Sequence, residues 1–156
     1  MDMSTGSLAA ALEREHHEID EGIAAFAAAR GDHEALTRSI QALRRHIYLE
    51  EELLFPALSE VEPALRAPVF VMLREHAQIW TLLDSLEQAL AADAAHPALI
   101  RQLTSHLMHH NLKEEKVLYP RADEVLSAAA AERFAEFLDS GEMPEGWMCL
   151  QARPAR

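Results

Sequence analysis

The 156-residue sequence has a single cysteine, Cys149, and only 5 glycines and 7 prolines. A lone cysteine excludes an internal disulfide and a zinc–thiolate cluster, because both need several thiols. Aromatic residues are also few, whereas alanine, leucine and glutamate are abundant. Few helix breakers among strong helix formers predict an all-α fold.

Basic residues are scarce as well, since 14 Lys and Arg stand against 26 Asp and Glu, a formal net charge of −12. Such an acidic chain is a poor partner for nucleic acid or for an anionic membrane face, and we expect neither. No apolar run reaches the ~18–20 residues that span a bilayer, and the first residues lack the pattern of a signal peptide. We therefore expect a cytoplasmic protein, and the sequence indicates no particular oligomeric state.

Helical periodicity runs through four long segments and one short one, with apolar residues recurring at three- and four-residue steps. Because the connections are short, neighbouring helices should be antiparallel. This predicts an up-down-up-down four-helix bundle at about residues 7–121, with a short C-terminal helix and tail at residues 127–156. Residues 1–156 are expected to form one domain, with Trp147 and Met148 folding back onto the bundle. The helices are expected at residues 7–30, 33–58, 64–91, 97–119 and 128–138.

One motif occurs twice in the chain. HIYLEEELLFP at residues 46–56 and HNLKEEKVLYP at residues 110–120 share H-x-x-x-E-E-x-x-L-[F/Y]-P. A Glu-His pair on the preceding helix accompanies each copy. Each half of the chain thus has one helix with Glu-His and one with the longer motif, which indicates an internal duplication with pseudo-twofold symmetry. The two pairs are Glu15-His16 and Glu75-His76.

Four histidines and two glutamates fall on the stripes that should face the interior. A carboxylate buried without a partner protonates or costs several kcal/mol of stability. A metal ion removes this cost, and imidazole and carboxylate suit iron, manganese or zinc. A single His or a single H-x-x-x-E is usually structural, but repetition over four helices predicts a metal site. The predicted ligands are His16, His46, Glu50, His76, His110 and Glu114.

Helix geometry and the duplication together suggest how these ligands divide. Positions i and i+4 lie on one helix face, so the His and Glu of each motif can reach one centre. We expect one ion at His16 and His46 and a second ion at His76 and His110, with both glutamates as bridges. This set is sparse for a six-coordinate metal, so water or an exogenous ligand should complete it.

These motifs resemble the hemerythrin-like, HHE cation-binding family over roughly residues 8–121. The resemblance implies a four-helix bundle that holds a non-haem centre of two iron ions on the six ligands above. Oxygen-carrying members have H-x-x-x-H on the third helix, but here Met72 and Trp80 stand four residues from His76. They also have an Asp five residues after the last His, where this chain has Glu115. The ligand set is closer to the H-x-x-x-E type of iron-sensing and iron–sulfur-repair members.

Several residues near the predicted ligands have open roles. His106 and Val117 lie on the inward stripe of the fourth segment, and His106 could be a fifth His ligand, a cavity cap or a hydrogen-bond partner. Glu15 and Glu75 are extra ligands, hydrogen-bond partners of ligands or solvated residues, and Glu115 competes with Glu114 as a ligand. Tyr48 is expected to pack. The histidines expected at the surface are His17, His33, His96 and His109.

The leading functional hypothesis is a cytoplasmic non-haem di-iron protein that binds or senses oxygen, nitric oxide or iron. The alternative is a di-iron enzyme that reduces peroxide or nitric oxide or assists iron–sulfur centre repair, with no protein nucleophile. A metal-free helical interaction module is a third hypothesis, and it predicts that chelators leave stability unchanged.

Overall fold

A computed structural model describes residues 7–29, 33–92 and 97–154 of the chain. Every regular element in these ranges is helical, which confirms the all-α prediction. Arg30 and Gly31, where the first helix was expected to end, lie outside the described residues. The α-helices are α1 Leu8–Ala29, α2 His33–Leu49, α3 Phe55–Val61, α4 Arg66–Ala91, α5 Pro97–Lys113, α6 Tyr119–Val125 and α7 Ala128–Ser140. Two π-helical turns, η1 Glu50–Leu54 and η3 Glu114–Leu118, and two 3-10 turns, η2 Pro63–Leu65 and η4 Leu150–Ala152, complete the structure.

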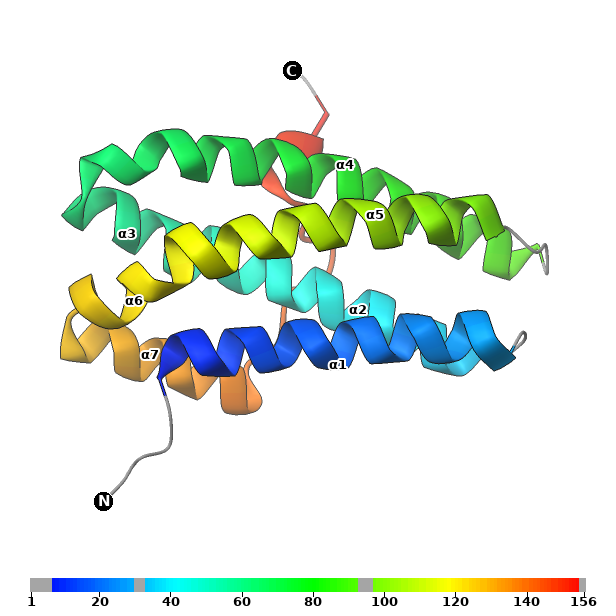
Figure 1. Ribbon diagram of the computed structural model, residues 1–156, viewed down its shortest axis with the longest axis horizontal. Helices are drawn as coiled ribbons and strands as arrows, with labels where there is room; N and C mark the ends of the chain where they lie inside the picture. Colours follow the sequence, from blue (N-terminus) through cyan, green and yellow to red (C-terminus); the bar gives the residue numbers. More distant parts are fainter. Residues whose placement is uncertain (1–6, 30–32, 93–96, 155–156) are drawn as a thin grey trace.

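The long helices lie lengthwise beside one another (Figure 1). Helix α1 packs against α2 and α5, and α4 packs against the same two helices. The π-helical turn η1 joins α2 to α3, and η3 joins α5 to α6, so each of these helices continues in the same general direction (Figure 1). This arrangement directs the apolar stripes of α1, α2, α4 and α5 into a shared interior.

The interior contains two separate apolar clusters. The first, which we call the α2–α5 core, includes Ile40, Ile47, Ile79, Leu83 and Leu103. The second, the α3–α7 core, is formed by another set of buried residues, namely Leu12, Leu49, Leu54, Phe55, Leu58, Leu65, Val69, Met72, Leu118, Tyr119, Ala122 and Phe134. In α1 and α4 a histidine, His16 or His76, separates the positions that contribute to one core from those that contribute to the other.

Both copies of the doubled motif contain a π-helical turn, which corrects the prediction of uninterrupted helices through residues 33–58 and 97–119. The backbone N–H of Phe55 donates to the carbonyl of Glu50, and that of Tyr119 donates to Glu114, five residues back in each case. Proline is the second residue after each turn, at Pro56 and Pro120. A proline ring lacks the N–H and clashes with the carbonyl four residues earlier, so the helix widens before it.

The wide turn changes which side chains face inward. Val117 was expected on the inward stripe, but it is 45% exposed, so that prediction was wrong. Tyr119 is instead buried, at 0% exposure, and Leu118 beside it is buried at 1%. The hydrogen bond from residue i+5 to residue i places Tyr119 above Glu114 on the same helix face. In a regular α-helix, Leu118 or Val117 would occupy that place.

The C-terminal segment after α7 returns to the long helices, as predicted. Figure 1 shows it leaving α7 at one edge of the molecule and reaching α4 at the opposite edge. The Trp147 ring meets Tyr48 and Trp80 edge-on, with centroids 5.0 and 5.6 Å apart, and Met148 packs on the α2–α5 core. Cys149 is buried in the same core.

None of the helices in the described ranges is both long and apolar enough to cross a membrane.

Helix α7 is anchored by Phe134, which is 1% exposed within the α3–α7 core. Replacing Phe134 with alanine should lower the free energy of unfolding by about 3–5 kcal/mol, because a cavity replaces a buried ring. Urea denaturation measures this change. Phe70→Ala is the matched control, since Phe70 is 49% exposed, and it should cost no more than about 0.5 kcal/mol. Equal losses in the two variants would contradict this packing of α7.

Candidate metal centre

Six polar side chains form a layer between the two apolar cores. They come from α1, α2, α4 and α5 and from the first residue of each π-helical turn. Each is almost fully inaccessible to solvent, with exposures between 0% and 3%. The layer contains all of the residues that the sequence predicted as ligands, namely His16, His46, Glu50, His76, His110 and Glu114.

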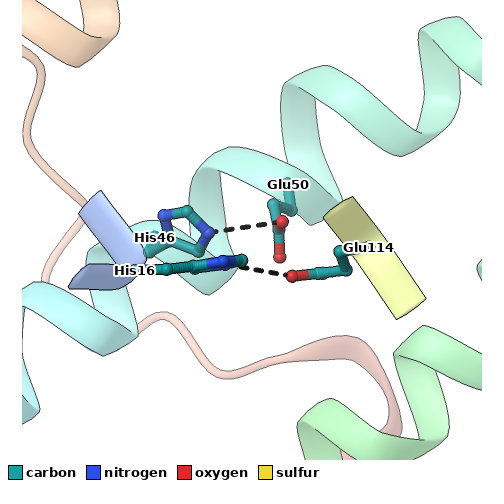
Figure 2. A group of neighbouring side chains, drawn as sticks. All are labelled: His16, His46, Glu50 and Glu114. Carbon is teal, nitrogen blue, oxygen red and sulfur yellow. Dashed lines mark ion pairs between the residues drawn. The ribbon is translucent and has the colours of Figure 1, made fainter. Parts of the chain in front are cut away.

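Four of these residues form what we call the first quartet, His16, His46, Glu50 and Glu114. Figure 2 shows the two imidazoles side by side, opposite the two carboxylates. His46 Nε2 lies 3.3 Å from Glu50 Oε2, and His16 Nε2 lies 3.2 Å from Glu114 Oε1. All four donor atoms fall within 4.8 Å of one another, so this group could hold a metal ion.

The second quartet contains the same two carboxylates with His76 and His110. His76 Nε2 lies 3.1 Å from Glu50 Oε1, and His110 Nε2 lies 3.0 Å from Glu114 Oε2. Each glutamate therefore turns one oxygen toward each quartet. The histidines are thus grouped by half, as the duplicated motif led us to expect; that each group holds one ion stays a prediction.

A second set of carboxylates binds the outer nitrogen of each histidine. An ionised carboxylate can only accept, so each Nδ1 carries a proton and donates it. Glutamates in this position fix the imidazole orientation and increase the basicity of the inner nitrogen. The four pairs are His16 with Glu115 at 2.8 Å, His46 with Glu15 at 2.8 Å, His76 with Glu51 at 2.7 Å and His110 with Glu75 at 2.9 Å.

These pairs resolve the roles that the sequence left open. Glu15, Glu75 and Glu115 are hydrogen-bond partners of histidines and belong to neither quartet. His106 is exposed, so its prediction on the inward stripe was wrong, and it lies outside both quartets. Tyr48 packs against Phe137 and Trp147, as expected. Of the histidines predicted at the surface, His17, His33 and His109 are exposed, and His96 lies outside the described residues.

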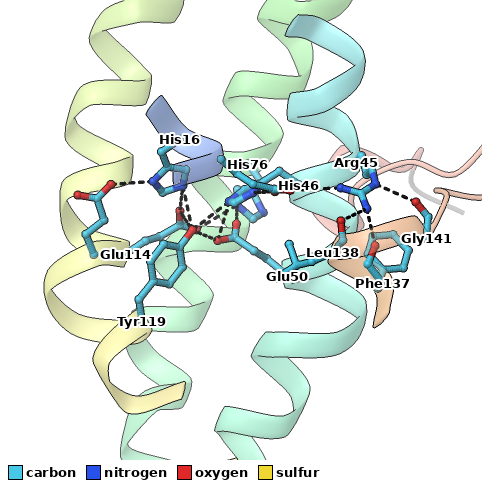
Figure 3. A network of polar contacts seen from close by, with 12 residues as sticks. His16, Arg45, His46, Glu50, His76, Glu114, Tyr119, Phe137, Leu138 and Gly141 are labelled. Carbon is cyan, nitrogen blue, oxygen red and sulfur yellow. Dashed lines mark hydrogen bonds and ion pairs between the residues drawn. The ribbon is translucent and has the colours of Figure 1, made fainter. Parts of the chain in front are cut away.

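Arg45 connects Glu15 to the end of α7. Its guanidinium donates to Glu15 Oε2 at 3.2 Å, to the Gly141 carbonyl at 2.8 Å and to the Leu138 carbonyl at 3.0 Å (Figure 3). It also bonds the Phe137 carbonyl. A cation satisfies the free carbonyls at a helix C-terminus and interacts favourably with the helix dipole there.

The C-terminal segment also contacts a second outer carboxylate. The backbone N–H of Leu150 donates to Glu51 Oε1 at 2.8 Å, while Glu51 Oε2 accepts from His76. Two of the four outer carboxylates are therefore positioned by residues after position 127: Glu15 through Arg45, and Glu51 directly. The third, Glu75, pairs with Lys113.

The layer has too many acceptors for its protons. With Nδ1 carrying the proton, a neutral imidazole presents an Nε2 lone pair, and the four Nε2 atoms face the two inner carboxylates. Glu114 Oε2 is buried and makes no hydrogen bond of acceptable geometry. Buried acceptors that face one another are costly unless a cation lies between them. The donor set therefore fits metal ions bound by imidazole and carboxylate.

Without a metal, protons take the place of the cation. Burial lowers the pKa of His46, but the Glu50 charge and the Glu15 hydrogen bond outweigh burial and raise it to about 10. The same balance raises the pKa of His76 and His110. Burial opposes ionisation of Glu114, yet the surrounding imidazoles, His110 first, hold its pKa well below the usual range.

Tyr119 also belongs to this site, and the sequence analysis did not identify it as a site residue. Its hydroxyl donates to Glu50 Oε2 at 2.5 Å and lies 2.9 Å from His16 Nε2 (Figure 3). Burial and the two carboxylates raise the pKa of the Tyr119 phenol well above its ordinary value. The available signal was Pro120, because a proline after the aromatic residue predicts the widened turn that directs it inward.

A helical protein with buried imidazoles around shared carboxylates belongs to the class of helical metal-binding proteins. A family model described as the hemerythrin HHE cation binding domain matches residues 7–122, and the chain belongs to this family. This confirms the family resemblance found in the sequence. Searches of curated proteins and of solved structures each returned no match to the chain.

Stability of the metal-free protein should fall as the pH rises. The pKa of His46 is about 10 in the folded protein against 6.5 ordinarily, so its contribution is complete below pH 6.5 and is lost as pH approaches 10. Urea denaturation of chelator-treated protein across this window measures the change. Metal-loaded protein is the control and should be less sensitive, because metal binding displaces the protons. An unfolding free energy that rises over this range would contradict the assignment.

Replacing Glu51 with glutamine should weaken metal binding by about 10- to 100-fold, because the His76 imidazole loses a charged partner. Competition against a chromophoric chelator measures the affinity. Glu52→Gln is the matched control, because Glu52 is exposed and contacts Trp147 rather than a histidine. If both variants bind metal as tightly as the unmodified chain, Glu51 does not support the centre.

Proposed function

We propose that this chain is a cytoplasmic non-haem di-iron protein that binds or senses oxygen, nitric oxide or iron. One observation carries the proposal: two histidine pairs share Glu50 and Glu114, so that two overlapping quartets lie side by side. Carboxylates shared between two cation positions support a paired centre, in which Glu50 and Glu114 would each help to hold both ions. His16 and His46 would hold one iron, and His76 and His110 the other.

The donor chemistry supports iron. Imidazole and carboxylate are the ligands of non-haem iron, and the described part of the chain places no thiolate in either quartet. Manganese and zinc suit the same donors, so the metal content is the first quantity to measure. When bound, iron would supply Lewis acidity and one-electron redox chemistry toward a small ligand.

The residues of the chain hold this centre and limit what reaches it. The outer carboxylates orient the imidazoles with their inner nitrogens toward the quartets. The apolar cores on either side exclude bulk water. Six ligand side chains with exposures of at most 3% favour a small reactant such as a diatomic gas or peroxide over a larger substrate.

The finer features of the fold are part of the same proposal. The packing of α1 and α4 against α2 and α5 supports an up-down-up-down four-helix bundle of the hemerythrin type. The contacts of Arg45 with α7, and of Leu150 with Glu51, support one domain for residues 1–156. A cytoplasmic location rests on the single cysteine and the acidic composition.

Elemental analysis of protein purified without a polyhistidine tag tests the proposal. The chain should contain two iron ions, one for each quartet, and its visible spectrum should change on exposure to air. His110→Gln should lose iron because the second quartet loses a donor. His106→Gln is the matched control, since this exposed histidine lies on the same helix, and it should retain the full iron content. Protein that is isolated fully helical without metal and does not respond to added iron, or equal iron content in the two variants, would contradict the proposal.

The same preparation separates a binding or sensing protein from the enzymatic alternative. A sensor binds peroxide or nitric oxide once per centre and stops. An enzyme consumes many equivalents of peroxide or nitric oxide per centre when a reductant is supplied. That outcome would show that the site reduces its ligand, and the sensing function would be rejected.

A further inference from the structure

The two halves of the duplicated motif differ at one position that faces the site. Phe55 and Tyr119 occupy equivalent places, each at the end of a π-helical turn and each buried, at 2% and 0% exposure. The Phe55 ring stacks on the His76 imidazole, with centroids 5.7 Å apart and an interplanar angle of 17°. The Tyr119 ring lies beside His16 and brings a hydroxyl into the polar layer.

The Tyr119 hydroxyl contacts every member of the first quartet (Figure 3). Its oxygen lies 2.9 Å from His16 Nε2, 3.0 Å from His46 Nε2, 2.5 Å from Glu50 Oε2 and 3.1 Å from Glu114 Oε1. The four groups come from four different elements of the chain, yet they converge on one oxygen atom.

When the imidazoles are neutral, a phenol cannot satisfy four such neighbours by hydrogen bonding alone. It has one proton, which the nearest acceptor, Glu50, receives. Glu114 then has no proton from the hydroxyl. In the neutral imidazoles that bind a metal, the two Nε2 atoms present lone pairs because each Nδ1 donates to an outer carboxylate. A cation bound at this point would be attracted by all five atoms, including the phenol oxygen.

The second quartet has no corresponding oxygen, since Phe55 offers only carbon at the equivalent place. Its histidines contact Glu50, Glu114 and their outer carboxylates. The orphaned oxygen, Glu114 Oε2, faces this quartet rather than the first.

We propose that Tyr119 is a fifth protein ligand of the iron in the first quartet, which makes the two metal positions chemically different. The proposal rests on the di-iron function above. Coordination replaces the phenol O–H bond by an oxygen–iron bond, and the proton leaves to solvent. The second position has one protein donor fewer, so an exogenous small ligand would bind there.

Visible absorption and resonance Raman spectra of the oxidised, iron-loaded chain test this assignment. A phenolate bound to ferric iron gives a charge-transfer band in the visible range together with enhanced phenolate ring vibrations. Both should be present in the unmodified chain and absent from Tyr119→Phe, the residue that the other half carries at this position. Tyr48→Phe is the control and should keep both the band and the ring vibrations. The chain has 2 tyrosines, so these two variants test every possible tyrosine ligand.

If the Tyr119→Phe variant folds poorly, a second measurement tests the same assignment without it. In the Tyr48→Phe protein, Tyr119 is the one remaining tyrosine, so ring-deuterated tyrosine should shift the enhanced vibrations if they arise from this ligand. An iron-loaded chain that lacks the band, or a band that survives in Tyr119→Phe, would overturn the tyrosine assignment alone. A chain that binds no iron by elemental analysis would overturn the di-iron function and the tyrosine assignment together.

Discussion

The fold depends on how six buried polar side chains are neutralised. Two inner carboxylates and four imidazoles occupy a layer with almost no solvent contact, and four further carboxylates surround it. Burying this many acceptors is unfavourable unless cations lie among them, whether protons or metal ions. The two apolar cores can form only if the layer between them is neutralised, so folding and cation binding are linked in this protein.

Much of this arrangement follows from sequence spacing. The i, i+4 pairs in the doubled motif predicted which His and Glu share a face, and the duplication predicted how the quartets divide. His106 was placed inside but is exposed. Further failures lie at the two π-helical turns, because α-helical counting continues through a turn that is not α-helical. Val117 was placed inside for this reason, and Tyr119 was not recognised. The outer glutamates could not be assigned, since a Glu beside a His in sequence does not show which histidine it reaches in space.

The outer carboxylates connect the two halves of the chain. Glu15 and Glu75 each bond a histidine on the neighbouring helix of their own half. Glu51 and Glu115 cross to the opposite half, where they bond His76 and His16. Each half therefore lacks part of its own hydrogen bonding, and neither duplicated helix pair could orient its two imidazoles alone.

The contacts made by α7 and the following segment have a consequence for comparing members of the family. The family match ends at residue 122, but Arg45 is held by the carbonyls of α7, and Glu51 accepts from the Leu150 backbone. Two proteins with identical ligands within the matched region would still differ in how firmly these imidazoles are oriented if their later residues differed. A change of sequence after residue 122 could thus alter the orientation of the imidazoles without altering any ligand.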